Sequence, residues 1–416
     1  MKRKTIMFFL MTVCVAMSGC GASGANTANN GDAGNSAGSA YTEGENSESG
    51  SISGTSGTSS DISGLIDTTD IFTDRDLAQT ADTIGAKSIS VTNGETIDIT
   101  DEGVYVLSGT AENCTVRVEA EDTDKVQLVL DGVTISNESS PAIYVVQADK
   151  CFVTTKDNNS ALSVTGTFMA DGDTNTDAVI FSKQDLVLNG EGTLDIYSTG
   201  NAVSVKDDLK ITGGSYIVRS DKHAFEVNDS VSVCGGDFKI TSSKDGFNCG
   251  NDNDETLGWT YISGGTFNIV SSSDGIRTAS LLQIDGGNID ITSSEGLEAT
   301  YIQINDGKIN INSNDDGINA TDKCNGYYKI AVEFNGGETN IIMGSGDVDG
   351  IDSNGSVYVN DGTINITIDE VGMAEAFDFD ETAELNGGEV YVNGERITEI
   401  TTNMPGGRRG NMGKGF

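Results

Sequence analysis

A carboxylate followed by glycine returns at nearly the same position of every repeat in the second half of the chain. Four copies are "SSKDGFNCG" from Ser242, "SSSDGIRTA" from Ser271, "SSEGLEAT" from Ser293 and "SNDDGINAT" from Ser313. Before each copy, two short alternating segments flank a Gly-Gly or Asp-Gly pair, and the copies follow one another at intervals of about 20 to 30 residues. Strand-and-turn repeats of this length bury their apolar residues by stacking on one another.

Aligned repeats place apolar residues in two columns, with polar residues between them. The first apolar column is Ile211, Val233, Ile262, Ile284, Ile304, Phe334, Val359 and Leu385, and the second is Val218, Ile240, Ile269, Ile291, Ile311, Ile341, Ile366 and Val392. The polar positions are Lys239, Asn268, Asp290, Asn310, Asn340 and Asn365. Because side chains alternate across a strand, this pattern predicts an all-β protein: a parallel β-helix (solenoid) whose N-terminal capping region is the less regular stretch 67–125. An antiparallel sandwich is the alternative.

The composition favours the same class and argues against some partners. The chain has 53 glycines and 2 prolines, and 24 Lys and Arg residues stand against 64 Asp and Glu residues, for a net charge of -40. Such a chain repels phosphate groups, so we expect no nucleic acid partner. His223 is the single histidine, which argues against a zinc site.

The ends of the chain predict export and anchoring. Three basic residues precede a short apolar run that ends in Ser18-Gly19-Cys20, the pattern of a lipoprotein signal peptide over residues 1–19 with Cys20 as the lipidated residue. Residues 20–66 predict a flexible Gly/Ser/Asn-rich tether, residues 67–400 the folded parallel β-helix domain, and residues 401–416 a Gly-rich disordered tail. The expected location is therefore extracellular, anchored to the cell membrane.

Stacked repeats would bring the carboxylates together. Strands of neighbouring repeats lie roughly 4.8 Å apart, so the acid-Gly position becomes a column of like charges, and a second polar column follows three residues later. A hard cation with oxygen ligands would neutralise such a surface, which predicts Ca2+. The predicted ligands are Asp245, Asp274, Glu295, Glu298, Asp315, Asp316, Asn319, Asp349 and Asp352. The alternative is a hydrated acidic face on which Asp-Gly serves the turn alone.

The segments "DTDKVQLVLDGVTISNESSPAIYV" and "DGDTNTDAVIFSKQDLVLNGEGTLDI", followed by the repeated "SSxDGI" units, resemble an extracellular bacterial carbohydrate-binding domain family with a polysaccharide-lyase-like right-handed β-helix. The resemblance covers about residues 67–400. It implies binding of plant cell-wall polysaccharide, both cellulose and acidic pectic chains, bound calcium and no established catalytic role.

The residues favour pectate (polygalacturonate) over crystalline cellulose as the polysaccharide. Calcium can bridge an anionic glycan to an acidic protein, whereas a flat cellulose face calls for several coplanar aromatic rings. Two aromatic pairs are candidate sugar platforms, Trp259 with Tyr261 and Tyr327 with Tyr328.

Two other functions remain open at this stage. One is a calcium-dependent polysaccharide lyase, in which Arg277 would remove the proton beside a uronate carboxylate. An arginine among acids is more simply an ion-pair partner, so we expect no catalytic residue. The other is a non-catalytic structural or adhesive surface protein.

Overall fold

The computed structural model describes residues 65–346, 348–368 and 374–401. The predicted signal peptide, Cys20, nearly all of the tether and nearly all of the tail lie outside these residues. Within them the helical content is one short element, α1 (Asp74–Leu77), which Thr73 begins with a capping box. No helix in these ranges has the length and hydropathy needed to cross a membrane.

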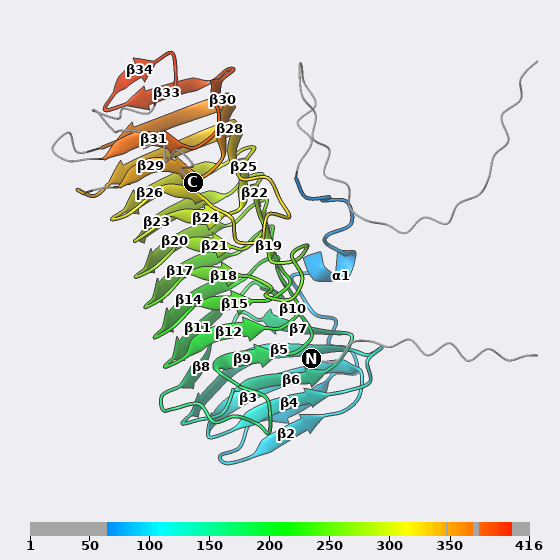
Figure 1. Cartoon of the computed structure of the whole chain (residues 1–416). Helices are drawn as coiled ribbons and strands as arrows, with labels where there is room; N and C mark the ends of the chain where they lie inside the picture. The colour runs from blue at the N-terminus through cyan, green and yellow to red at the C-terminus, as the bar shows by residue number, and fades with distance from the viewer. Residues whose placement is uncertain (1–64, 347, 369–373, 402–416) are drawn as a thin grey trace, which may run out of the picture. The chain divides into compact units, whose positions relative to one another are not determined.

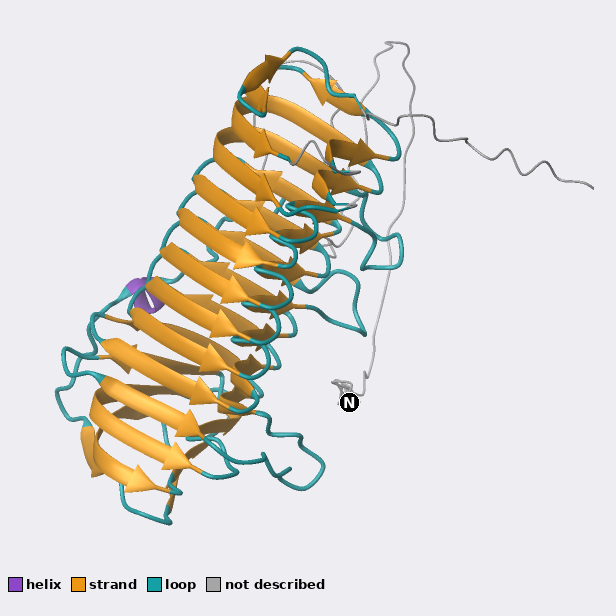
Figure 2. Ribbon diagram, turned by 90° about the vertical axis from the view of Figure 1, so that its left-hand side faces the viewer, coloured by secondary structure: helices purple, strands orange, loops and turns teal. Residues whose placement is uncertain are grey.

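The described chain is otherwise strands, and most repeats contribute three (Figures 1 and 2). The strands that open the repeats are β7 (Lys150–Thr155), β10 (Asp185–Gly190), β13 (Asp208–Ile211), β16 (Ser230–Val233), β19 (Trp259–Ile262), β22 (Leu281–Ile284) and β25 (Tyr301–Ile304). The strands that follow the glycine corner are β8 (Ser160–Val164), β11 (Thr193–Ser198), β14 (Ser215–Ser220), β17 (Asp237–Ser242), β20 (Thr266–Ser271), β23 (Asn288–Ser293) and β26 (Lys308–Ser313).

The third strands form a separate 12-stranded sheet. They are β2 (Thr96–Ile99), β4 (Thr115–Glu119), β6 (Ile143–Gln147), β9 (Ala178–Ser182), β12 (Asn201–Val205), β15 (Phe225–Val227), β18 (Phe247–Cys249), β21 (Ile276–Thr278), β24 (Leu297–Ala299), β27 (Ile318–Ala320), β29 (Asp349–Ser353) and β31 (Glu375–Phe379). The remaining strands are β1 (Lys87–Ser90), β3 (Gly103–Glu112), β5 (Lys125–Asn137), β28 (Ala331–Met343), β30 (Ser356–Thr367), β32 (Ala383–Leu385), β33 (Glu389–Val392) and β34 (Glu395–Ile397).

The hydrogen-bond topology corrects the predicted fold class. The strands that open the repeats and the strands that follow the glycine corner do not form two separate sheets. They are joined because β5 pairs with both β7 and β8, and β28 pairs with both β25 and β26. These long strands close a parallel circuit of 16 strands within the 22-stranded sheet. The prediction of a right-handed β-helix (solenoid) is therefore wrong: the protein is all-β, with a closed 16-strand parallel arrangement and a second parallel sheet.

The physical reason lies at the glycine corners. The prediction assumed that every Gly-Gly or Asp-Gly corner ends a strand. Gly132 and Gly337 take positive φ angles of 69° and 74°, but the strands β5 and β28 continue through them. A β-bulge with glycine bends a strand without ending it.

The predicted N-terminal capping region is also corrected. Strands β1 to β4 occupy much of stretch 67–125 and pair in parallel register with the strands that follow, β3 with β5 and β4 with β6. This stretch is therefore part of the two sheets. Its alternating residues, such as Val116 and Val118, are fully buried.

The two predicted apolar columns are confirmed by the register. Ile262 lies opposite Ile284 and Ile284 opposite Ile304, while Ile269 lies opposite Ile291 in the second column. Phenylalanines stack among them, with the rings of Phe225 and Phe247 4.5 Å apart and nearly parallel. Each buried aliphatic side chain contributes about 1.5 to 3 kcal/mol relative to an exposed one, so these columns are the main stabilisation.

Polar side chains outside the core also form columns. The Nδ2 atom of Asn340 donates to Oδ1 of Asn310 over 2.9 Å, and Asn365 donates to Asn340 over 2.8 Å. Asn310 in turn donates to Asp290 over 2.6 Å. These side-chain hydrogen bonds run between neighbouring repeats, so the side chains on the outward face of the sheet are ordered as well as those on the inward face.

Two insertions interrupt this regular pattern. The link between the third strand and the next repeat is short in most repeats, for example Ala279 and Ser280 between β21 and β22. It lengthens to residues 250–258 between β18 and β19, and to residues 321–330 between β27 and β28. The two loops meet where Nδ2 of Asn325 donates to Oε1 of Glu255 over 3.2 Å. Loops held on a rigid scaffold are common places for binding residues.

Candidate functional site

The acid-Gly turns stack through their backbones. The amides of Gly246, Gly275 and Gly296 donate to the carbonyl groups of the acids in the next repeat, over 3.0, 2.9 and 3.1 Å. A Cβ atom at Gly296 would lie 2.3 Å from the carbonyl oxygen of Gly317, and one at Gly246 would lie 2.6 Å from that of Gly275. The glycine of the motif is therefore required by close packing, and the acid before it needs a different explanation.

Basic side chains lie beside the carboxylates in the first part of this acidic surface. Nδ1 of His223 lies 3.1 Å from Oδ2 of Asp245. Glu298 is 5% exposed and lies between two cations, with Nε of Arg277 2.8 Å from Oε2 and Nζ of Lys323 2.6 Å from Oε1. Arg277 also lies 3.8 Å from Asp274. Three of the predicted calcium ligands, Asp245, Asp274 and Glu298, thus have basic neighbours.

The pKa values of this part differ with the surroundings. Burial would raise the pKa of Asp245, but hydrogen bonds from His223, Ser273 and the Asp274 amide outweigh it, so the pKa stays below its ordinary value. Burial and the charges of Asp245 and Glu298 raise the pKa of Asp274 to about 8. Asp274 is the carboxyl in this part that takes up a proton most easily.

The second part of the surface, which we call the acidic row, comprises Glu295, Asp315, Asp316, Asn319, Asp349 and Asp352. Among the described residues, no Lys or Arg nitrogen lies within 4.0 Å of the carboxylates of Glu295, Asp349 or Asp352. Burial, followed by the charge of Glu298, raises the pKa of Glu295 to about 7. Burial and the charge of Asp316 raise the pKa of Asp349 to about 7 and that of Asp352 to about 6. Among the described residues, Glu295, Asp349 and Asp352 therefore feel neighbouring negative charges without a lysine or arginine in ion-pair distance.

Asn319 lies at the centre of the acidic row with one oxygen unused. It pairs with Glu298 on one side and Asp352 on the other. Its Nδ2 atom donates to Oε2 of Glu295 over 3.1 Å, while its Oδ1 atom is buried and accepts no hydrogen bond from the described residues. A buried acceptor without a donor is costly, and a cation satisfies it as well as an N–H group does. The donor set is entirely oxygen, which fits calcium.

The candidate aromatic pairs are placed differently from each other. Tyr261 is 7% exposed and donates from its hydroxyl to Asp285 over 3.1 Å, while Trp259 is half-buried. Tyr327 is 54% exposed on the 321–330 loop, and its ring meets that of Tyr328 edge to face at 4.8 Å. Tyr327 is the candidate ring most open to a sugar.

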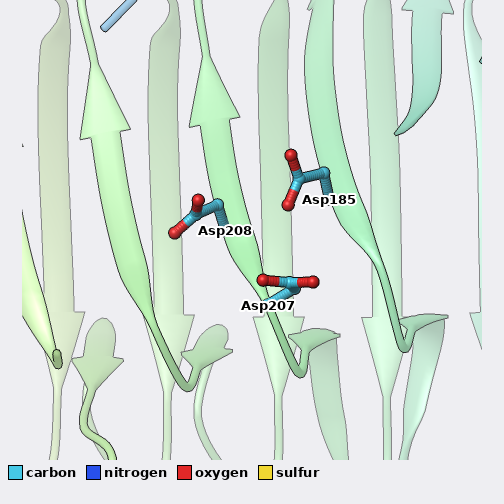
Figure 3. Close-up of side chains that lie close together, drawn as sticks. All are labelled: Asp185, Asp207 and Asp208. Atoms are coloured by element: carbon cyan, nitrogen blue, oxygen red, sulfur yellow. The ribbon is translucent and has the colours of Figure 1, made fainter. Parts of the chain in front are cut away.

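One acidic cluster was missed by the sequence reasoning. Asp185, Asp207 and Asp208 place one carboxylate oxygen each within 4.8 Å of one another (Figure 3). Asp185 and Asp208 begin the neighbouring strands β10 and β13, and burial followed by the charge of Asp208 raises the pKa of Asp185. The sequence contains the signal, because "QDL" and "DDL" stand at the starts of the two strands, but the aligned columns begin only at Ile211.

A polar cleft of about 520 Å3 lies beside the acidic surface, between the two inserted loops. Its lining includes five asparagines, three basic and three acidic residues. Arg277 and Lys323 belong both to this cleft and to the ion pairs with Glu298.

Comparison with known proteins identifies the family to which the chain belongs. The family model described as "Carbohydrate-binding domain-containing protein" matches residues 93–348, which is more than half of the chain. The chain belongs to this carbohydrate-binding family. The family resemblance inferred from the sequence is thereby confirmed.

A family member from Acetivibrio thermocellus, also described as a carbohydrate-binding domain-containing protein, is 32% identical over 136 residues, or 32% of this chain. The match covers 47% of that relative, so the chain spans about half its length. A solved structure described as the polysaccharide lyase-like protein from C. thermocellum, gadolinium derivative, is 26% identical with a TM-score of 0.51. That similarity covers 53% of this chain and 99% of the other.

Arg277, the residue considered above for lyase chemistry in this family member, donates hydrogen bonds to two neighbouring side chains. Nε of Arg277 donates to Glu298 over 2.8 Å and Nη1 donates to Asn248 over 2.9 Å. A guanidinium group has five donors and no acceptor, so this arrangement holds it as a cation. The geometry suits binding an anion better than removing a proton.

Proposed function

We propose that this protein binds acidic plant cell-wall polysaccharide outside the cell, with Ca2+ at the acidic row and a lipid anchor at Cys20. Pectate is the proposed main ligand, with cellulose as a second possible polymer. The protein acts by binding, without cleaving the chain.

One observation carries the proposal: among the described residues no Lys or Arg nitrogen lies within 4.0 Å of the carboxylates of Glu295, Asp349 or Asp352, and Asn319, which donates to Glu295 and pairs with Asp352, keeps a buried Oδ1 atom that accepts no hydrogen bond from them. Calcium would draw its ligands from the oxygens of Glu295, Asp316, Asn319, Asp349 and Asp352, which would have to move closer together, because the described acids whose oxygens already lie within 4.8 Å of one another are Asp185, Asp207 and Asp208. When bound, calcium would supply positive charge to a surface that otherwise repels a uronate polymer.

Binding of the full chain to polygalacturonate, cellulose and xylan, each with calcium and with EDTA, tests the proposal. The expected result is retention by polygalacturonate that calcium strengthens and EDTA weakens. Asp349→Asn should reduce the effect of calcium, whereas Asp290→Asn should not, because Asp290 faces outward on β23 and accepts a hydrogen bond from Asn310. Equal retention in EDTA and calcium would contradict the role of the acidic row.

A lyase is the second candidate function, since the structural neighbour is described as polysaccharide lyase-like. Incubation with polygalacturonate and calcium separates the two, because a lyase generates the absorbance of an unsaturated uronate. We expect no such absorbance from this protein.

A further inference from the structure

The cleft between the two inserted loops has the chemistry of a ligand site in its own right. Its floor comes from the links and third strands of the stacked repeats, including Asn248, Arg277 and Ala279, and its walls are residues 250–258 and 321–330. The hydrogen bond from Asn325 to Glu255 joins the walls across two intervening repeats. The concavity is therefore built by the same two insertions that break the regular repeat.

The polar lining matches sugar hydroxyl groups. Asparagine amides both donate and accept hydrogen bonds, as a hydroxyl group does, and five of them line this cleft. Leu257, Val227 and Ala279 add apolar contacts of the kind that the C–H face of a sugar ring uses.

The charges of the lining indicate which kind of sugar the cleft takes. The chain carries -40 overall, yet the basic and acidic residues of this cleft are equal in number. Arg277 and Lys323 meet on the single carboxylate of Glu298, and Nζ of Lys206 lies 3.7 Å from Glu226. Nη2 of Arg277 donates to no group of the described residues, and Nζ of Lys323 retains protons beyond the one that faces Glu298. An anion meets less repulsion here than along the acidic row.

From this arrangement we infer that the cleft is a calcium-independent subsite for a uronate sugar of an acidic oligosaccharide. The sugar carboxylate lies against Arg277 and Lys323, and the hydroxyl groups lie against the asparagine amides. This subsite deepens the proposed function and rests on it: calcium at the acidic row holds the polymer, and the cleft holds one end or one residue of it. The two sites adjoin through Glu298.

Calorimetric titration of the full chain in EDTA with a short oligogalacturonate tests the subsite. The wild-type protein should bind this probe and should bind a neutral oligogalactose of the same length at least tenfold more weakly. The double variant Lys206→Gln with Lys323→Gln should lose at least tenfold in affinity, and Lys239→Gln on the exposed face of β17 should bind as the wild type does. Melting curves establish that each variant folds.

Asn253→Ala gives a second test that spares the ion pairs. Asn253 is exposed, and its backbone amide donates to Oδ1 of Asn251, so the loop keeps its conformation while the cleft loses one side-chain amide. We expect a loss of severalfold in affinity for the oligogalacturonate.

The outcomes separate the subsite from the proposed function. Unchanged affinity in both cleft variants, or equal binding of the neutral oligomer, overturns the subsite. Polymer binding that needs calcium, together with no oligomer binding in EDTA, overturns the subsite and leaves the proposed function standing. Oligomer binding in EDTA without any binding of the polymer in calcium supports the subsite and refutes the proposed role of the acidic row.

Discussion

Removing one charge from the acidic row should have opposite effects with and without calcium. At pH 8 the carboxyl of Asp349 is ionised, because its pKa is raised only to about 7. Asp349→Asn removes a charge that faces Asp316 and Asp352 but keeps an oxygen to accept the hydrogen bond from the Glu375 amide, which is 3.1 Å long. The calcium-free variant should therefore melt at a higher temperature than the calcium-free wild type.

The magnitude follows from charge spacing and mass action. Two unit charges roughly 4.8 Å apart repel by about 3.5 kcal/mol at an effective dielectric of 20, and the partial exposure of these groups reduces this to about 1 kcal/mol. A calcium site with a Kd of about 0.1 to 1 mM stabilises the wild type by about 1.4 to 2.7 kcal/mol in about 10 mM calcium. For about 330 ordered residues this is a rise of roughly 2 to 4 °C in melting temperature.

Differential scanning calorimetry at pH 8, in EDTA and across a calcium titration to about 10 mM, measures both effects. Asp349→Asn should show a calcium-induced shift of less than half the wild-type value, and Asp290→Asn should keep the whole shift. The reasoning is refuted if the wild type shows no calcium-induced shift, or if Asp349→Asn lowers the calcium-free melting temperature while keeping the full calcium response.

Three further predictions concern stability. In EDTA the melting temperature should fall as the pH rises from about 5 to 8. The folded-state pKa values of Glu295 and Asp349 are raised to about 7, so in that window the folded protein holds more protons than the unfolded chain. Calcium should restore more stability at pH 8 than at pH 5. Gly296→Ala should lower the free energy of unfolding, measured by urea denaturation, by about 1 to 3 kcal/mol, because the new Cβ atom would lie 2.3 Å from a backbone oxygen. Gly250→Ala should be near neutral, because the nearest atom to its Cβ would be 3.4 Å away. Equal losses in the two variants would contradict the packing argument. Asp76→Ala should cost about 3 to 5 kcal/mol by the same measurement, since Asp76 is fully buried between two lysines and its side chain completes the capping box with Thr73 at the start of α1. A cost below about 1 kcal/mol would show that this pairing is not stabilising.

The sequence predicted the register of the repeats well because each strand carries an unambiguous alternation. Ile269, Ile291 and Ile311 face one core, and a slip by one residue would send every one of them into water. The circuit that closes the large sheet could not be predicted in the same way. It depends on whether the chain continues as a strand through Gly132 and Gly337, and glycine permits both a corner and a bulge.

The candidate site was likewise predictable from the sequence only in part. The order of Glu298, Asn319 and Asp352 along neighbouring strands followed from the repeat, and the structure places them in that register. The balance of charge did not follow, because Lys323 reaches Glu298 from an inserted loop whose length and sequence the regular repeats do not share. Contacts made by insertions depend on three-dimensional geometry that periodicity does not encode.

The pairing of β34 with β33 affects how copies of this protein meet one another. A parallel stack ends in a strand whose free N–H and C=O groups could accept the next molecule, and repeated addition would produce fibres. Here β33 pairs antiparallel with β34, a strand of three residues that begins with the exposed Glu395 and Arg396. A short, charged and reversed strand is a poor template for another chain. At high protein concentration, this ending would keep neighbouring copies from joining end to end.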